Sequence, residues 1–169
     1  MALCLLPLLA ACGEAVKENP RAVEEQTTLR DEDIPQRVPY ADALTIYSLK
    51  ASEGPPRDLP PDAESFLGYQ VLGNYTVVDP TERKAVVRAL NRAMAEDAVQ
   101  NKCFIPRHGF RMTTADTTIN YLVCFQCGQY YVGKYQGTGE AISKSAQPLI
   151  DGILKNAGVP LNPGQGETE

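Results

Sequence analysis

The chain has 169 residues, the length of about one domain at roughly 100–200 residues per domain. Charged residues make up 22% and hydrophobic residues 43%, close to the globular average, which excludes full-length disorder and a fibrous protein. Sixteen Lys and Arg against 21 Asp and Glu give a net charge of −5. The chain lacks the basic surplus that non-specific nucleic-acid binding requires, so no nucleic-acid partner is expected.

The N-terminus carries an export signal. Leu3 to Leu9 is apolar, and the small residues Ala10 and Ala11 precede Cys12, as a signal peptidase requires. Leu9-Ala10-Ala11-Cys12 resembles the lipobox of bacterial lipoprotein precursors. This resemblance implies that residues 1–11 are a signal peptide, that Cys12 carries a lipid and that acyl chains anchor the protein in the cell envelope. Gly13 after the lipidated cysteine implies sorting to the outer membrane.

A tether and one domain are expected to follow. Residues 14–39 hold seven acids and four bases with few large aliphatic side chains, too few to form a core. We therefore expect a flexible tether over 12–39, in which a short helix over 22–33 is compatible with the sequence. A single domain is predicted over 40–158 and a disordered tail over 159–169.

The first half of the domain predicts two strands and a helix. Residues 43–49 alternate and are rich in β-branched and aromatic side chains, which is typical of a strand. Four prolines within 52–64 indicate an irregular loop, and 68–78 is strand-like with a bulge or turn at Gly73-Asn74. A helix is expected to begin at Asp79, whose side chain can accept from the Glu82 amide.

This helix has two distinct faces. Its apolar stripe and its outward face recur at helical spacing. The outward face is interpreted as solvated surface, with a partner site as the alternative. The stripe comprises Val87, Leu90, Met94 and Ala98, and the outward face comprises Arg83, Lys84, Arg88, Asn91 and Arg92.

The second half predicts a hairpin of 104–113 and 117–125, a third strand over 129–135, a turn over 137–140 and a last helix. That helix runs from Ala141 or Pro148 to Ala157, before Gly158 and Pro160. The expected fold class is α+β, a small and mostly antiparallel sheet with two helices packed on one face.

One cluster of cysteine and histidine residues could bind a metal ion or form a disulfide. Cys103, His108, Cys124 and Cys127 fall within 25 residues, and the Cys-x-x-Cys-Gly form of 124–128 is that of a zinc knuckle. Together the four side chains would complete a Cys₃His set, which suits tetrahedral zinc. Zinc is the one cofactor that the sequence allows for; otherwise none is expected.

Strand geometry favours a disulfide instead. Alternate strand residues point to opposite faces, so Cys103 would share a face with either Cys124 or Cys127, and His108 with the other. We expect a disulfide from Cys103 to whichever cysteine shares its face, as suits an exported protein. A Cys124–Cys127 bond is disfavoured because three residues of extended strand span about 10 Å, beyond the roughly 7 Å bridging limit. Zinc, unpaired buried thiols and a redox-active thiol remain alternatives.

Basic residues surround this cluster. Segment 101–139 holds four bases, and its only acid is Asp116. The basic side chains either protect a strand edge from aggregation or form an anion-binding spot made of Lys102, Arg107 and Arg111.

The segments Cys103-Phe104-Ile105-Pro106-Arg107-His108-Gly109 and Cys124-Phe125-Gln126-Cys127 resemble a family of uncharacterised bacterial exported proteins. The resemblance covers about 43–135 and implies an architecture and a site, not a reaction. His108 with either later cysteine lacks an orienting third group, so no catalytic residue is nominated and an enzyme is not favoured. We expect a lipid-anchored envelope protein that acts as a binding or scaffolding module, with the membrane and an envelope protein as partners. The alternative is a zinc-binding or thiol-redox protein.

Overall fold

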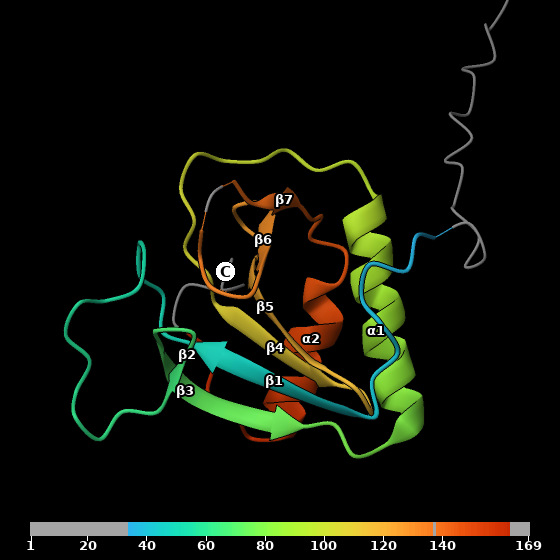
Figure 1. Ribbon diagram of the computed structural model, residues 1–169, viewed down its shortest axis with the longest axis horizontal. Coiled ribbons are helices and arrows are strands. Elements are labelled where there is room, and N and C mark those ends of the chain that lie inside the picture. The colour runs from blue at the N-terminus through green and yellow to red at the C-terminus, as the bar shows by residue number, and fades with distance from the viewer. Residues whose placement is uncertain (1–33, 137, 163–169) are drawn as a thin grey trace, which may run out of the picture.

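The computed structural model describes residues 34–136 and 138–162 (Figure 1). Its strands form one antiparallel sheet of seven strands, in the order β2-β3-β1-β4-β5-β6-β7, and two helices accompany it. The mixed α+β fold is therefore as predicted. The strands are β1 (Ala43–Leu49), β2 (Ser65–Phe66), β3 (Tyr69–Thr76), β4 (His108–Thr113), β5 (Thr118–Cys124), β6 (Gln129–Val132) and β7 (Glu140–Ala141). The helices are α1 (Pro80–Ala95) and α2 (Gln147–Asn156).

Several expectations concern the N-terminal 33 residues. The signal peptide over 1–11, the lipidated Cys12 and the short helix over 22–33 lie outside the described residues. Within the ranges that are described, no helix has both the length and the apolar character to cross a membrane.

The central strand β1 forms as predicted and pairs with β3 on one side and β4 on the other. Ser48 lies opposite Gly73, whereas Leu49 lies opposite Val71. One extra residue on β3 makes this a β-bulge, next to the predicted irregularity at Gly73-Asn74. β2 and β7 were not predicted because each has only two residues, too few for a periodic pattern.

The helix α1 begins at the predicted place, with Pro80 in its first turn and Asp79 as its cap. Asp79 Oδ1 accepts from the Thr81 amide at 2.9 Å, one residue earlier than expected. Val87, Leu90 and Met94 are buried as predicted, but the prediction that Asn91 faces outward is wrong. Asn91 is buried because its side-chain amide pairs with the backbone of Val38.

Residues on both sides of the range 40–158 pack against the domain. Ile34 and Val38, expected in the tether, are buried against the domain. Val159, expected in the disordered tail, is also buried, and Asn162 Oδ1 accepts from the Ala51 amide at 3.0 Å. Scattered apolar residues cannot form a core by themselves, but they can complete one that the sheet and helices provide.

The core has two parts. Because strand side chains alternate between faces, neighbouring residues such as Ile46 and Tyr47 enter different clusters. The first cluster joins both helices to β1, β4 and β5, and Figure 1 shows α2 behind the central strands. The second cluster is rich in aromatic residues. It comprises Tyr47, Leu49, Phe66, Tyr69, Phe104, Leu122, Cys124, Cys127 and Tyr131.

Candidate functional site at the cysteine turn and the pocket on α1

A disulfide joins Cys124 to Cys127, with their Cα atoms 5.1 Å apart. The expectation that Cys103 pairs with one of them is wrong, and within the described residues Cys103 is an exposed free thiol. The reason is local: β5 ends at Cys124, and the chain turns before β6 begins at Gln129. The Cys127 amide donates to the Cys124 carbonyl at 3.2 Å, so the estimate for an extended strand does not apply.

The disulfide is buried, since Cys124 is 2% and Cys127 is 3% exposed. Each sulfur accepts a backbone hydrogen bond. The Cys127 amide donates to Cys124 Sγ at 3.1 Å, and the Ile105 amide donates to Cys127 Sγ at 3.4 Å. External reagents therefore reach these sulfurs only after the surrounding chain moves.

The loop that precedes β4 is held against this turn. The Asn101 amide donates to the Cys127 carbonyl at 2.9 Å, and Asn101 Nδ2 donates to the Gln126 carbonyl at 2.9 Å. Gly128 has φ +66°, and a Cβ there would lie 2.3 Å from the Val99 carbonyl oxygen. Only glycine fits this close approach, which holds the loop that contains Cys103 against the cysteine turn.

His108 is placed elsewhere. It lies opposite Ser48 on β1 and Val123 on β5, and Val123 belongs to the first cluster whereas both disulfide cysteines belong to the second. The four proposed zinc ligands are therefore not brought together. Within 34–136 and 138–162, no group of three or more His, Cys, Asp or Glu side chains could hold a metal ion.

His108 Nε2 instead lies 2.8 Å from Asp151 Oδ1 on α2. Burial alone would raise the pKa of Asp151, but the hydrogen bond and charge interaction with His108, together with Gln147 and Lys155, lower it below its ordinary value. His108 Nδ1 and Ser48 Oγ are both buried without a hydrogen-bond partner in the described part of the chain. Sequence reasoning missed Asp151, because no local spacing connects residues 43 positions apart.

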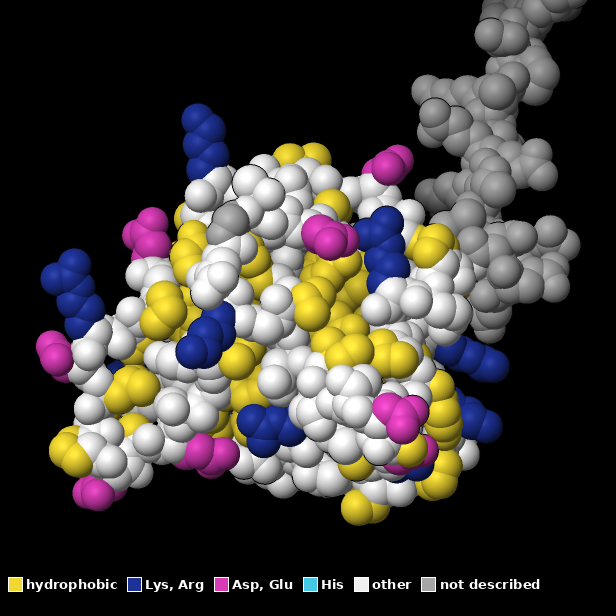
Figure 2. Space-filling model, in the orientation of Figure 1, with side chains coloured by type: hydrophobic (Ala, Val, Ile, Leu, Met, Phe, Trp, Pro, Cys, Tyr) yellow, Lys and Arg dark blue, Asp and Glu magenta, His cyan; other side chains and the backbone are white. Residues whose placement is uncertain are grey.

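The three basic residues of the expected anion-binding spot have separate environments. Arg107 Nη1 donates to Gln126 Oε1, and burial lowers the pKa of the Arg107 guanidinium. The Arg111 guanidinium lies 5.5 Å from the ring centroids of Tyr47 and Phe66, and Lys102 is exposed in the loop. Figure 2 shows Lys and Arg side chains spread over the visible face.

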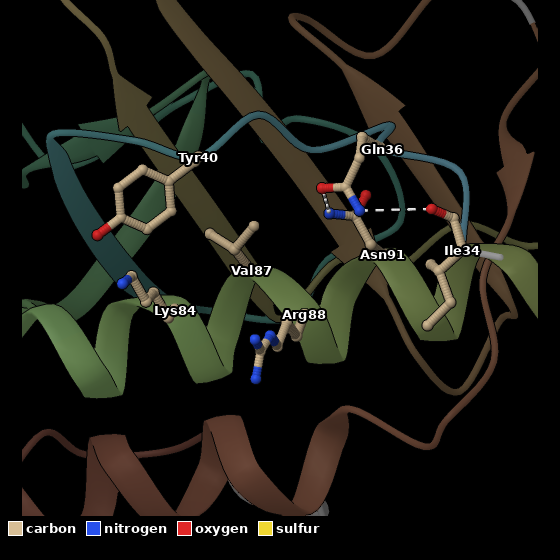
Figure 3. Close-up of a pocket in the computed structure, with 7 residues that line it drawn as sticks. All are labelled: Ile34, Gln36, Tyr40, Lys84, Val87, Arg88 and Asn91. Atoms are coloured by element: carbon tan, nitrogen blue, oxygen red, sulfur yellow. Dashed lines mark hydrogen bonds between the residues drawn. The ribbon is translucent and has the colours of Figure 1, made fainter. Parts of the chain in front are cut away.

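A pocket of about 420 Å³ lies between residues 34–40 and α1 (Figure 3). Lys84 Nζ lies 5.7 Å from the centroid of the Tyr40 ring. Asn91 holds the pocket wall, since its Oδ1 accepts from the Val38 amide at 2.7 Å and its Nδ2 donates to the Val38 carbonyl at 2.9 Å. The lining residues are Ile34, Gln36, Tyr40, Lys84, Val87, Arg88 and Asn91.

Sequence reasoning missed this pocket for one reason. Lys84 and Arg88 were interpreted as solvated surface, and residues 34–39 as tether, so no wall was expected opposite them. The spacing of the two cations, one helical turn apart, was the available signal. No protein-family model matches this chain, and searches of curated proteins and of solved structures find no match to it.

Proposed function

We propose that this protein is a lipid-anchored envelope protein whose domain binds a small anionic molecule in the pocket on α1. The observation that carries the proposal is the pocket itself, a cavity of about 420 Å³ that combines two cationic side chains, an aromatic ring and an apolar floor. Small-molecule sites are typically concave and largely preformed, and they hold a small number of precisely placed polar groups.

The charges in the pocket favour an anion. Lys84 and Arg88 are one helical turn apart and both line the pocket, so a ligand there meets two positively charged side chains. An anionic group placed beside them gains charge-assisted hydrogen bonds. The Tyr40 ring and the buried Val87 supply apolar surface for the remainder of the ligand (Figure 3).

The location is supported by two features. Leu9-Ala10-Ala11-Cys12 resembles a lipobox, and a disulfide such as Cys124–Cys127 is expected in proteins of oxidising compartments. The pocket includes Ile34, where the described residues begin. An anchor at Cys12 would therefore hold the pocket near the membrane, and we place the protein at the outer membrane.

We also propose that both helices pack on one face of the sheet. The shared cluster of Leu90 from α1, Ile150 from α2 and Phe110 from β4 supports this arrangement. The aromatic second cluster would then close the opposite face.

The binding proposal is tested with the full chain carrying Cys12→Ser, which removes the lipid. Phenyl phosphate serves as an anionic probe and benzyl alcohol as its neutral counterpart, with NMR chemical-shift titration as the readout. Phenyl phosphate is expected to shift α1 resonances, and Lys84→Ala or Arg88→Ala to weaken its binding about 5- to 20-fold, about 1–2 kcal/mol. Equal binding of both probes, or unchanged binding in both variants, would contradict the proposal. Lys155→Ala, an exposed cation on α2, is the matched control.

The anchor is tested separately in bacterial cells. Wild-type protein is expected in the membrane fraction and to incorporate labelled palmitate, whereas Cys12→Ser is expected to lose both properties. A Cys4→Ser variant controls for the loss of a leader cysteine. Retention of Cys12→Ser in the membrane fraction would exclude lipid anchoring through this residue without bearing on the pocket.

A further inference from the structure

The buried disulfide and the exposed thiol of Cys103 lie on segments in direct contact. The Asn101 amide bonds to the Cys127 carbonyl at 2.9 Å, and the Ile105 amide bonds to Cys127 Sγ at 3.4 Å. Cys103 stands midway between these two contacts, within two residues of each, a chain length of at most about 7 Å. Asn101 and Ile105, two residues before and two residues after Cys103, thus both form hydrogen bonds to Cys127.

The loop is also anchored next to Cys103. The Phe104 ring is buried and lies 4.5 Å from the Tyr131 ring centroid and 5.3 Å from that of Tyr135. Cys103 itself is exposed. The loop therefore presents the Cys103 thiol to solvent, while the backbone on either side of it is bonded to Cys127.

We propose that Cys103, Cys124 and Cys127 form a thiol–disulfide exchange site, in which Cys103 connects the buried disulfide to thiols in solution. The Cys103 thiolate attacks Cys127 Sγ, the Cys124–Cys127 bond breaks as a Cys103–Cys127 bond forms, and Cys124 leaves as a thiolate that takes up a proton. The chain is neither oxidised nor reduced in this step. The leaving Cys124 sulfur already accepts from the Cys127 amide at 3.1 Å, a hydrogen bond that strengthens when the acceptor becomes charged.

The new disulfide is accessible at its Cys103 end. A small-molecule thiol attacks Cys103 Sγ, and Cys127 leaves as a thiolate. A second thiol then attacks the mixed disulfide at the small-molecule sulfur and releases Cys103. Two external thiols are oxidised to one disulfide, and the chain gains the two electrons and the two protons. This inference does not depend on the pocket on α1.

The first experiment measures regioselectivity in the full chain carrying Cys12→Ser and Cys4→Ser, so that only these three thiols remain. In a Cys124→Ser variant, oxidised glutathione is expected to produce a Cys103–Cys127 disulfide, mapped by mass spectrometry. In the matched Cys127→Ser variant, a Cys103–Cys124 bond is expected to form at least about tenfold more slowly, because the residues on both sides of Cys103 bond to position 127 and exchange rates depend on which sulfur can be reached. In concentrated urea the two variants are expected to cross-link at similar rates. Equal rates in the native state, or free thiols in the Cys124→Ser variant, would overturn the proposal.

The second experiment leaves the native disulfide intact. Reduced glutathione is added to the same background with and without Cys103→Ser, and the thiols of Cys124 and Cys127 are trapped with a maleimide over time. Loss of Cys103 is expected to slow their reduction about tenfold or more, because direct attack on buried sulfurs requires local opening. Equal reduction rates in both chains would exclude Cys103 as the entry point. Urea unfolding of both chains verifies equal stability.

Discussion

His108 Nε2 lies 2.8 Å from Asp151 Oδ1 and joins β4 to α2 through a partly buried contact. The histidine is almost completely buried, whereas the carboxylate is partly exposed. The pair therefore connects the sheet to the C-terminal helix, and the His108 ring also packs edge-on against Phe125 of the cysteine turn, with 5.2 Å between the ring centroids.

This contact predicts sensitivity to acid. Because the pKa of Asp151 is lowered in the folded state, its stabilising contribution is present above the ordinary aspartate value and is lost progressively below about pH 4. Asp151→Asn is expected to lower the free energy of unfolding at neutral pH by about 1–3 kcal/mol and to flatten its decline between neutral and acidic pH. Urea unfolding across this range measures both effects. Asp62→Asn, at an exposed loop position, should behave like wild type, and an unchanged acid slope in Asp151→Asn would contradict the prediction.

The turn that follows Cys127 is expected to require glycine at position 128. Gly128 and Gly133 both have positive φ, but a Cβ at Gly128 meets the Val99 carbonyl at 2.3 Å whereas one at Gly133 meets nothing within 4 Å. Gly133→Ala is expected to cost about 1–2 kcal/mol from backbone strain alone. Gly128→Ala should cost about 1–3 kcal/mol more because of the added clash. Equal melting temperatures for the two variants would show that the loop does not press on this turn.

We expect the side chain of Asn91 to hold residues 34–40 against α1. Its side chain satisfies both the amide and the carbonyl of Val38, so Asn91→Ala is expected to cost about 2–3 kcal/mol. The segment should also detach locally, and trypsin should cleave after Arg37 faster than in wild type under native conditions. Asn74→Ala removes only an exposed contact with Glu64 and serves as the control. Cleavage at the wild-type rate would mean that other contacts hold residues 34–40.

Two buried tyrosines predict opposite responses to loss of the hydroxyl. Tyr69 Oη is buried and has no hydrogen-bond partner among the described residues, whereas Tyr121 Oη donates to the Arg37 carbonyl at 3.2 Å. Tyr69→Phe is expected to be neutral or to stabilise by up to about 1 kcal/mol, and Tyr121→Phe to destabilise by about 1 kcal/mol. Burial, with their tyrosine neighbours, raises the pKa of both to about 12, so ultraviolet titration of each variant should lose a step near that pH. Equal stability changes would contradict the assignment.

Local chemistry explains which elements were predictable. The alternation in Ala43–Leu49 and the Asp79-Pro80 start of α1 are short-range signals, since a strand face and a helix cap depend on adjacent residues. The strand 104–113 was predicted too long because β4 begins only at His108, after the Pro106 position that cannot donate to a ladder.

The cysteine site shows where prediction from strand periodicity fails. The prediction that His108 shares a face with one of Cys124 and Cys127 is wrong, because it assumed that 124–127 remains extended. The chain turns there instead, and both cysteines enter the second cluster. One local change of backbone direction thus replaced the expected Cys103 disulfide with the Cys124–Cys127 disulfide. The periodicity of the sequence does not reveal such a turn.

The amino-acid order by itself determined the strands with alternating side chains, the helix α1 with its cap at Asp79, and the mixed α+β class. Each of these depends on contacts between residues that are close in the sequence. Only the tertiary structure decided that Cys124 bonds to Cys127, that His108 meets Asp151 and that Asn91 closes a pocket over α1. These three relationships depend on how the chain turns and which distant segments pack together, and that choice is made by the burial of the whole core rather than by any local pattern.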